Sequence, residues 1–362
     1  MNIDEKIKLI SRNCEEIITS EDLKARLESG VEMQHYIGFE ISGLVHLGTG
    51  LVSMGKIADF VRAGIKCRIF LADFHSYLNN KLGGNWDEIR WATENYFKEA
   101  LIASLKCFDV DISKVEFVMG KDYYREHPEE WENLMKVAKH ITLSRNLRSI
   151  SIMGKQQGND VDMATLIYPP LQVADIFTME IDLAHAGMDQ RKAHVVARDV
   201  AKKLNWKAPI AIHHNLIAGL DGPDKDQKDN ETLKMSKSKP DSAIFIHDSP
   251  ETIKEKIKKA YCPEGIIEFN PIINWIKTLI FWGENDGELE IKRDEKFGGD
   301  VKYNNFKEFL IDYTEKKIHP MDLKNAVAEW LINKLSPARD HFEIPKNKQS
   351  LARMMAYFPK NL

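Results

Sequence analysis

The most informative part of this sequence is the stretch His35-Tyr-Ile-Gly-Phe-Glu40, which is followed by Ser42-Gly43 and then by His46-Leu-Gly48-Thr49. The first six residues are typical of a short buried strand, and Ser42-Gly43 is typical of a turn. Residues 48 to 63 have helical periodicity, which ends at Gly64. A glycine beside an imidazole at a helix N-terminus lets the backbone and a neutral donor approach an anion closely. The stretch therefore predicts a strand, a turn and a helix that form one part of a nucleotide site.

A second motif, Lys234-Met-Ser-Lys237-Ser238, lies in a segment from residue 219 to residue 240 that is rich in Asp, Lys and Gly. This segment has almost no apolar periodicity, which predicts a flexible loop. Two lysines three residues apart in such a loop are suited to the charge that develops on a departing pyrophosphate. We interpret the two motifs together as two halves of an ATP site, although a solvated basic loop is the simpler alternative for the second.

Strands and helices alternate along the first two thirds of the chain. Further strands are expected at 67–72, 114–119, 181–185 and 210–213, and helices are expected within 4–29, at 86–106, at 129–148, after Pro170 and at 189–204. This order predicts an α/β fold with a parallel, Rossmann-like sheet that is covered on both faces. Ligands bind such sheets beyond the carboxyl ends of the strands, where Glu40, Asp73 and His75 fall. Asp73 and His75 are equally consistent with strand-end caps.

The pattern changes near residue 250, where only helical periodicity remains. The clearest helices are expected at 250–261, 272–281 and 322–335. A chain of 362 residues exceeds what one hydrophobic core usually organises. We therefore expect an α/β catalytic domain at 1–245 and a smaller, all-helical domain at 246–362.

The composition indicates an ordinary globular protein and excludes a strongly basic one. The formal net charge is −4, so any contact with RNA must come from local patches. The four cysteines lie far apart without a C-x-x-C spacing, which favours reduced thiols. The N-terminus lacks the apolar core of a signal peptide, and no apolar stretch approaches the roughly 20 residues of a membrane span. We expect a cytoplasmic protein with no membrane contact.

Residues 134 to 158 carry basic side chains with no acid between them, namely Lys136, Lys139, His140, Arg145, Arg148 and Lys155. Such a stripe fits the phosphates of RNA, and it fits a solvated surface equally well. His213 and His214 are adjacent and would point to opposite faces of a strand, so no metal site is predicted there.

Several longer motifs resemble those of a known family. They are Tyr36-Ile-Gly-Phe-Glu40, Leu71-Ala-Asp-Phe-His75, Tyr168-Pro-Pro-Leu-Gln172-Val-Ala-Asp175, Gly187-Met-Asp-Gln190-Arg-Lys192, Lys234 to Ser238, Glu295-Lys-Phe-Gly-Gly-Asp300 and His319-Pro-Met-Asp322-Leu-Lys324. On these motifs the chain resembles the class I aminoacyl-tRNA synthetases, and among them the tyrosyl-tRNA synthetases of archaeal and eukaryotic type. The resemblance extends to about residue 340.

The resemblance implies a tyrosine–tRNA ligase that activates L-tyrosine with ATP and Mg²⁺ and then transfers the tyrosyl group to the 3′-terminal adenosine of tRNA(Tyr). Magnesium would arrive with ATP rather than in a protein-bound metal site. The resemblance also implies a homodimer, with an insertion at about 120–165 for dimerisation and acceptor-stem contact, and an anticodon-binding role for 246–362.

The resemblance assigns roles to individual residues. Tyrosine would be bound by Tyr36, Tyr168, Gln172, Asp175 and Gln190. ATP would be bound by Gly38, Glu40, His46, Gly48, Thr49, Lys234, Ser236 and Lys237, of which His46, Thr49, Lys234 and Lys237 would be catalytic. Transfer RNA would be bound by Arg145, Arg148, Arg191, Lys192, Phe297, His319 and Asp322.

The residues themselves leave alternatives open. Asp175 lies in an apolar run, which favours a buried carboxylate over an exposed one, and Asp322 is also typical of a helix N-cap. Gln172 and Gln190 would otherwise be surface residues, and Tyr168 would be ordinary helix packing. Thr49 stands where the family usually has a second histidine.

Two other functions share parts of this pattern. Tryptophan activation uses the same architecture, and a non-catalytic RNA-binding relative could keep the fold. The resemblance leaves residues 341 to 362 without a role.

Overall fold

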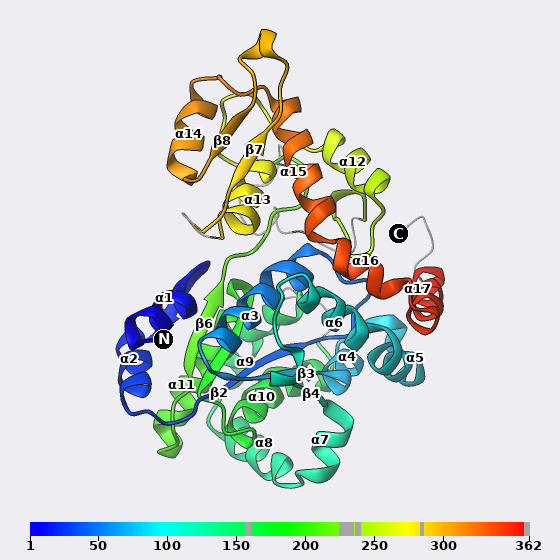
Figure 1. The fold of residues 1–362 in the computed structure, drawn as a ribbon. Helices are drawn as coiled ribbons and strands as arrows, with labels where there is room; N and C mark the ends of the chain where they lie inside the picture. Colours follow the sequence, from blue (N-terminus) through cyan, green and yellow to red (C-terminus); the bar gives the residue numbers. More distant parts are fainter. Residues whose placement is uncertain (156–160, 224–234, 236–239, 283–285, 358–362) are drawn as a thin grey trace. The chain divides into compact units, whose positions relative to one another are not determined.

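The computed structural model describes residues 1–155, 161–223, 235, 240–282 and 286–357. The chain divides into two compact units (Figure 1). The first unit comprises Met1–Gly43, Lys56–Lys98 and Val110–His214, and the second comprises Leu44–Gly55, Glu99–Asp109 and Asn215–Leu362. The segment that begins at His46 therefore belongs to the second unit, although its neighbours in sequence belong to the first.

The first unit is built on a six-stranded sheet with the order β1-β6-β5-β2-β3-β4. The strands are β1 (Cys14–Ile18), β2 (Gln34–Phe39), β3 (Lys66–Leu71), β4 (Val115–Met119), β5 (Leu183–Gly187) and β6 (Ile210–His214). The predicted α/β class is confirmed, and so are the five predicted strands. All neighbours pair in parallel except β1, which pairs with β6 in antiparallel fashion.

Strand β1 is a correction to the sequence prediction, which had only helices at 4–29. Its five residues lie between α1 (Ile3–Ser11) and α2 (Ser20–Glu28), and none of them is fully buried. Because an edge strand with one half-exposed face carries charged residues, it lacks the apolar run by which the inner strands are recognised.

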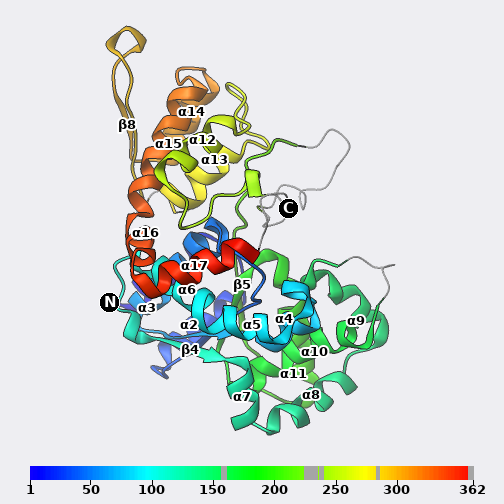
Figure 2. The same ribbon diagram turned by 90° about the vertical axis from the view of Figure 1, so that its right-hand side faces the viewer.

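The remaining helices of this region are α3 (Met54–Arg62), α4 (Asp73–Leu78), α5 (Trp86–Ala92), α6 (Lys98–Lys106), α7 (Gly120–Glu126), α8 (Glu129–Lys139), α9 (Leu143–Ser149), α10 (Met163–Thr178) and α11 (Arg191–Leu204). The single helix expected at 129–148 is wrong, because α8 ends at Lys139 and Thr142 caps a new helix by accepting from the Arg145 amide at 3.3 Å. Helix α10 packs against α8, α9, α11 and α4 (Figure 2).

Helix α10 begins eight residues before the expected start, at Met163 instead of at Leu171, directly after Pro170. The Asp162 side chain caps it by accepting from the Thr165 amide at 2.7 Å. Pro170 has no N–H to give to the Leu166 carbonyl, which instead accepts from Asn146 Nδ2 at 2.7 Å. A side chain of α9 thus replaces the lost main-chain hydrogen bond, so the helix continues through both prolines.

The second unit is helical after residue 250, with α12 (Pro250–Lys259), α13 (Pro271–Trp275), α14 (Phe306–Thr314), α15 (Pro320–Lys334), α16 (Ser336–Phe342) and α17 (Pro345–Tyr357). The expected all-helical domain is wrong in one respect, because β7 (Leu289–Ile291) and β8 (Val301–Tyr303) form an antiparallel hairpin. Strands of three residues are too short to show a period-2 pattern. Trp275, Phe281, Phe309 and Tyr313 are fully buried in its core.

Among the described residues, no helix has the length and apolar character needed to cross a membrane.

Candidate active site

The first unit buries a cluster of phenols around the carboxylate of Asp175. Asp175 on α10 has no exposed surface, and its Oδ1 accepts from the Tyr124 hydroxyl at 2.8 Å. Tyr36 on β2 is also buried, and its pKa is raised well above the ordinary value by burial and by the charges of Asp175 and Glu130. The prediction that Asp175 is buried is confirmed. A fully buried acid beside two phenols is suited to reading a third hydroxyl.

The second oxygen of Asp175 remains available to a ligand. Oδ2 has no hydrogen-bond partner in the described part of the chain, and it lies 3.6 Å from His75 Nε2. Burial lowers the pKa of His75 to about 3, so its imidazole is neutral. Burial and the nearby Glu130 raise the pKa of Asp175, while the Tyr124 hydrogen bond lowers it. An unpaired buried carboxylate oxygen costs free energy unless a donor such as a phenol reaches it.

Glu40, at the end of β2, is held by several polar side chains. Its Oε1 accepts from Asn79 Nδ2 at 2.7 Å, and its Oε2 lies 3.2 Å from Lys81 Nζ. Burial, the charge of Glu40 and a hydrogen bond to it raise the pKa of Tyr168 well above its usual value. The rings of Tyr168 and His75 meet edge to face, with centroids 4.7 Å apart. Tyr168 thus lies between Glu40 and the Asp175 cluster.

The two predicted glutamines also lie together. Gln172 Nε2 donates to Gln190 Oε1 at 3.4 Å, and Gln190 Nε2 donates to the Ile152 carbonyl at 3.0 Å. Gln172 Oε1 is buried and has no partner among the described residues. All five residues predicted to bind tyrosine therefore lie in the first unit. Charges couple Tyr36, Tyr168 and Asp175, and a hydrogen bond joins the two glutamines. Oriented amide and carboxylate oxygens of this kind can accept from an ammonium group.

The structure explains why position 38 is a glycine, which the sequence alone did not. A Cβ atom at this position would lie 2.6 Å from the Tyr36 hydroxyl, so only glycine leaves the phenol its place. Sequence reasoning also missed Tyr124 and Glu130, because both lie in helices without a distinctive spacing. The paired tyrosines Tyr123-Tyr124 after β4 were the one available signal.

The His46 motif lies in the second unit and begins a π-helix. Residues Gly48–Ser53 form this helix, a form that is frequent at functional sites. The Gly48 amide donates to His46 Nδ1 at 3.0 Å, so the neutral ring carries its proton on Nε2. A Cβ at Gly48 would lie 2.8 Å from this ring, which explains the glycine. His46 and Thr49 are both half-buried.

The structure connects this motif with the start of the second motif. His46 forms a β-bridge with Phe245, and the Leu47 amide donates to the Ile244 carbonyl at 3.1 Å. Met235 is buried, and its amide donates to the Ile217 carbonyl at 2.9 Å. The side chain of Ile217 would lie 3.2 Å from a Cβ at Gly48, so Met235 and Gly48 share a neighbour. Lys234, Ser236 and Lys237 lie outside the described residues.

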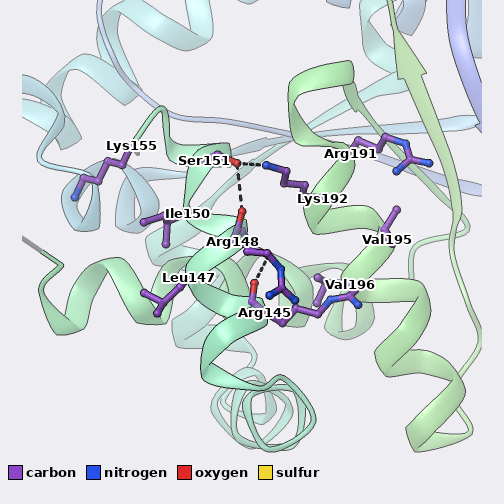
Figure 3. Close-up of a pocket in the computed structure, with 11 residues that line it drawn as sticks. Arg145, Leu147, Arg148, Ile150, Ser151, Lys155, Arg191, Lys192, Val195 and Val196 are labelled. Atoms are coloured by element: carbon purple, nitrogen blue, oxygen red, sulfur yellow. Dashed lines mark hydrogen bonds between the residues drawn. The ribbon is translucent and has the colours of Figure 1, made fainter. Parts of the chain in front are cut away.

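A basic pocket of about 410 Å³ lies in the first unit (Figure 3). Five cations line it, namely Arg145, Arg148, Lys155, Arg191 and Lys192. Lys192 Nζ donates to Ser151 Oγ at 2.8 Å, and Arg191 makes two hydrogen bonds to Glu16 at 2.7 and 2.8 Å. Helix α11 begins at this pocket, and its dipole adds to the attraction for anions. The structure thus gathers the four arginines and lysines predicted to bind RNA.

The predicted anticodon residues lie in the second unit. Phe297 is 62% exposed, in the short η10 helix (Glu295–Phe297) between β7 and β8. His319 is the N-cap of α15 and accepts from the Met321 amide at 3.2 Å, so the N-cap alternative for Asp322 is wrong. Asp322 lies in the first turn of that helix, half-buried.

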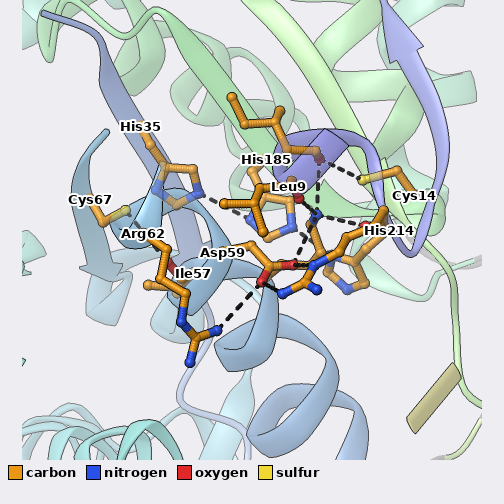
Figure 4. A network of polar contacts seen from close by, with 12 residues as sticks. Leu9, Cys14, His35, Ile57, Asp59, Arg62, Cys67, His185 and His214 are labelled. Atoms are coloured by element: carbon orange, nitrogen blue, oxygen red, sulfur yellow. Dashed lines mark hydrogen bonds and ion pairs between the residues drawn. The ribbon is translucent and has the colours of Figure 1, made fainter. Parts of the chain in front are cut away.

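A second polar network of the first unit serves the fold (Figure 4). Lys56 is fully buried, and its Nζ donates to the carbonyls of Leu9, Ile10 and Arg12. Beside it, a chain of histidines runs from His35 to His185 at 3.1 Å and on to His214 at 2.8 Å. No group of acids, histidines and cysteines in the described part of the chain could hold a metal ion.

Comparisons with known proteins agree with this geometry. Residues 28–336 match the family model of class I tRNA synthetases for tryptophan and tyrosine, described as "tRNA synthetases class I (W and Y)". The chain therefore belongs to the class I tRNA synthetases of this family.

Within that family, its high-identity relatives are archaeal tyrosine–tRNA ligases. The ligase of Thermococcus sibiricus is 50% identical, over 95% of this chain and 96% of the relative. The crystal structure of tyrosyl-tRNA synthetase from Pyrococcus horikoshii, complexed with L-tyrosine, superposes with a TM-score of 0.93 at 47% identity and covers 98% of this chain and 100% of that one. A tryptophanyl-tRNA synthetase from Aeropyrum pernix, 19% identical, shares the fold with a TM-score of 0.68.

Proposed function

We propose that this protein is a tyrosine–tRNA ligase, which joins L-tyrosine to tRNA(Tyr) at the expense of ATP. The observation that carries the proposal is the buried Asp175 with its free Oδ2, next to Tyr36, in a chain half identical to tyrosine–tRNA ligases. The Pyrococcus horikoshii relative with this fold was crystallised with L-tyrosine. Tryptophan offers an indole N–H in place of a phenol hydroxyl, so a direct comparison of the two amino acids is part of the test below.

In the proposed mechanism, Asp175 accepts from the phenol of the substrate while Tyr36 contacts the same hydroxyl. Tyr168, Gln172 and Gln190 hold the α-ammonium group and so orient the carboxylate. That carboxylate attacks the α-phosphorus of ATP, and pyrophosphate leaves. Because little covalent work falls to the protein, catalysis rests on positioning and on stabilising charge.

The nucleotide would be held by Gly38 and Glu40 at the end of β2 and by the His46 motif. His46 Nε2–H is a neutral donor, and Thr49 supplies a hydroxyl where relatives usually have an imidazole. Lys234 and Lys237, with Ser236, would stabilise the triphosphate, and Mg²⁺ would enter bound to its phosphates.

The proposed tRNA contacts fall into two groups. The basic pocket of Arg145, Arg148, Arg191 and Lys192 would take phosphates of the acceptor stem. Phe297, exposed at the hairpin, would stack on an anticodon base, while His319 and Asp322 would contact base edges. These assignments divide the chain into a catalytic domain at 1–245 and an anticodon-binding domain at 246–362.

We place the protein in the cytoplasm, where tRNA is charged.

We also propose a homodimer that forms through the insertion at about 120–165 and the helices packed on it. The helices α8, α9 and α10 pack together and expose large apolar side chains, namely Trp131, Met135, Leu143, Met163 and Ile167. Exposed apolar patches of this kind mark protein interfaces.

Amino-acid-dependent ATP–pyrophosphate exchange with tyrosine, tryptophan and phenylalanine tests the proposal. We expect exchange with tyrosine alone, followed by tyrosylation of tRNA(Tyr). Exchange with tryptophan would favour the other branch of the family, and no exchange with any of the three would favour a non-catalytic RNA-binding relative.

A further inference from the structure

A second buried acid lies next to the Asp175 cluster, and the mechanism above does not use it. Glu130, in the first turn of α8, has no exposed surface, and neither of its carboxylate oxygens has a hydrogen bond of good geometry among the described residues, although the nearby Thr178 hydroxyl lowers its pKa. Buried acids are normally paired, because an uncompensated charge in a protein interior is costly. The placement of Glu130 therefore calls for a functional explanation.

The surroundings of Glu130 are the walls of the phenol site. Helix α8 packs against α10, where Asn133 Nδ2 donates to Thr178 Oγ1 at 3.0 Å. Trp131, the next residue after Glu130, contacts the ring of Tyr124 with centroids 5.8 Å apart. Tyr124 in turn donates to Asp175. One aromatic and one hydrogen-bond contact thus connect the start of α8 with the carboxylate that reads the substrate hydroxyl.

The electrostatics of this region favour neutral hydroxyls. The charge of Glu130 acts on Tyr36, Tyr123, Tyr124 and Asp175, and in each case it disfavours ionisation. The charges that act on Asp175 come from Glu130 and Asp73, which are both acids. The titratable and charged groups around this region are Tyr36 on β2, Arg68 on β3, Asp73 and His75 on α4, Tyr123 and Tyr124 on α7, His127 and Glu129 next to Glu130, and Asp175 on α10.

A substrate phenol bound at Asp175 Oδ2 would meet the same field as Tyr36 and Tyr124. A neutral phenol donates its proton to the carboxylate, whereas a phenolate offers no donor and adds a negative charge beside two acids. We propose that Glu130 acts with Asp175 as a second acid that excludes ionised phenols, so that the site selects tyrosine over ring-substituted analogues whose hydroxyl is ionised at neutral pH. This inference rests on the proposed function and names Glu130 as a specificity-determining residue.

The pH dependence follows from the sign of the shift. Burial raises the pKa of Glu130 to about 7, so Glu130 is neutral below that pH and gains its charge above it. The exclusion of phenolates by Glu130 is therefore weaker in mildly acidic solution and stronger in mildly alkaline solution.

The test uses fluorinated tyrosines as inhibitors of tyrosine-dependent ATP–pyrophosphate exchange, because fluorine changes the ring volume little. In 2,3,5-trifluorotyrosine the phenol ionises near neutral pH, whereas in 3-fluorotyrosine it stays largely protonated. For the wild-type enzyme we expect the ratio of the two inhibition constants to rise about tenfold per pH unit above the pKa of the free trifluorotyrosine phenol, as its neutral fraction falls. A ratio that does not change with pH, or no inhibition by trifluorotyrosine even where it is neutral, would overturn the inference.

The variant Glu130→Gln tests the residue itself, because it keeps the volume and removes the charge. We expect it to reduce the ratio of inhibition constants at about pH 8 by at least about fivefold, as removal of a nearby charge predicts. Glu132→Gln, two residues along the same helix and exposed, is the matched control and should leave the ratio unchanged. An unchanged ratio in a folded Glu130→Gln enzyme would contradict the role of Glu130.

The wild-type profile keeps the inference testable if Glu130→Gln fails to fold, because a ratio that levels off above about pH 7 would contradict exclusion by a charge that appears there. The two proposals also fail in different ways. An enzyme that exchanges with tyrosine but ignores the ionisation of the analogue keeps its proposed function and loses only this inference. An enzyme with no tyrosine-dependent exchange loses the proposed function itself.

Discussion

At the residue scale, specificity rests on which buried polar atoms a ligand satisfies. In the proposed binding mode, phenylalanine would leave Asp175 Oδ2 without a donor. Sites built to bond a hydroxyl reject the analogue that lacks it by roughly 10⁴ to 10⁵, without an editing step. Tyr36 and Tyr124 beside Asp175 also stay neutral, because burial and the nearby acids raise the pKa of their hydroxyls.

Tyr124 provides the first prediction at this scale. Its hydroxyl lowers the pKa of Asp175, which burial otherwise raises, so Tyr124→Phe should raise that pKa further. Asp175 must be ionised to accept from the phenol, and its contribution is lost as the pH falls through its pKa. We therefore expect the acid limb of the kcat/KM profile for tyrosine to move to higher pH, with a loss of about tenfold near neutral pH, the usual effect of one hydrogen bond to a charged group.

Pyrophosphate-exchange kinetics across the pH range would measure this shift. Tyr77→Phe, an exposed tyrosine on α4, is the control. An acid limb that stays in place in Tyr124→Phe would show that this hydroxyl does not tune Asp175.

Only some of these residues could be predicted from the sequence. The burial of Asp175 was predicted from the apolar run Val173–Ile176 in which it lies. Tyr124 and Glu130 could not be assigned, because their importance comes from a contact between α7, α8 and α10 that no local spacing encodes. Gly38 was predicted for a different reason, since the side chain that needs its space is Tyr36.

At the element scale, the buried Lys56 joins α3 to the C-terminal end of α1. Three main-chain carbonyls accept from its ammonium group, and Asp59 lies 3.7 Å away. Removing one partner of a buried charged network leaves the others unsatisfied. We expect Lys56→Ala to reduce the free energy of unfolding by about 3–5 kcal/mol.

Denaturant titration would measure this loss. Lys66→Ala removes an exposed lysine that pairs with the exposed Glu32, and it should cost at most about 1 kcal/mol. If both variants lose the same free energy of unfolding, the buried Lys56 stabilises the fold no more than an exposed lysine does.

The β7–β8 hairpin gives another prediction at this scale. Phe297, in η10, is 62% exposed among the described residues. If it stacks on an anticodon base, Phe297→Ala should raise the KM for tRNA(Tyr) by roughly 10- to 100-fold, as loss of one stacked base predicts.

Pyrophosphate exchange without tRNA should remain unchanged in Phe297→Ala. Ile311→Ala, another exposed apolar residue of the second unit, is the control. A defect in exchange, or an unaltered KM for tRNA, would remove Phe297 from the anticodon site.

The sequence predicted elements best where the apolar pattern was strong. Strands β2 to β6 followed from their apolar runs, whereas β1 carries two acids and the strands of the hairpin have only three residues each. Helix α10 was predicted to start too late, because the side chain of Asn146 compensates for Pro170 from a different helix. Contacts between elements, which a single sequence does not show, account for these differences.

At the scale of the whole molecule, the sequence placed one boundary near residue 245. The structure has two compact units, each assembled from separate stretches, with the His46 motif grouped with residues after Asn215. A β-bridge to Phe245 brings about this grouping, and such a long-range pairing leaves no local signal in the sequence.

The proposed dimer makes a prediction at this scale. Met135 on α8 and Leu143 on α9 are 64% and 63% exposed. If they lie in the interface, Met135→Asp with Leu143→Asp should give a monomer in analytical ultracentrifugation, because a desolvated unpaired charge is costly. Met355→Asp with Ile344→Asp, exposed positions in the C-terminal region, should leave the wild-type mass. A wild-type protein that sediments as a monomer would contradict the dimer.

The central claim is that Asp175 reads the substrate hydroxyl, and the ratio of kcat/KM for tyrosine over phenylalanine in ATP–pyrophosphate exchange tests it most directly. The wild-type ratio should be roughly 10⁴ or more, and in Asp175→Ala it should fall by at least about 100-fold. Asp87→Ala, an exposed aspartate of α5, should keep the wild-type ratio. An unaltered preference for tyrosine in a folded Asp175→Ala enzyme would show that the hydroxyl is read elsewhere and would contradict this account.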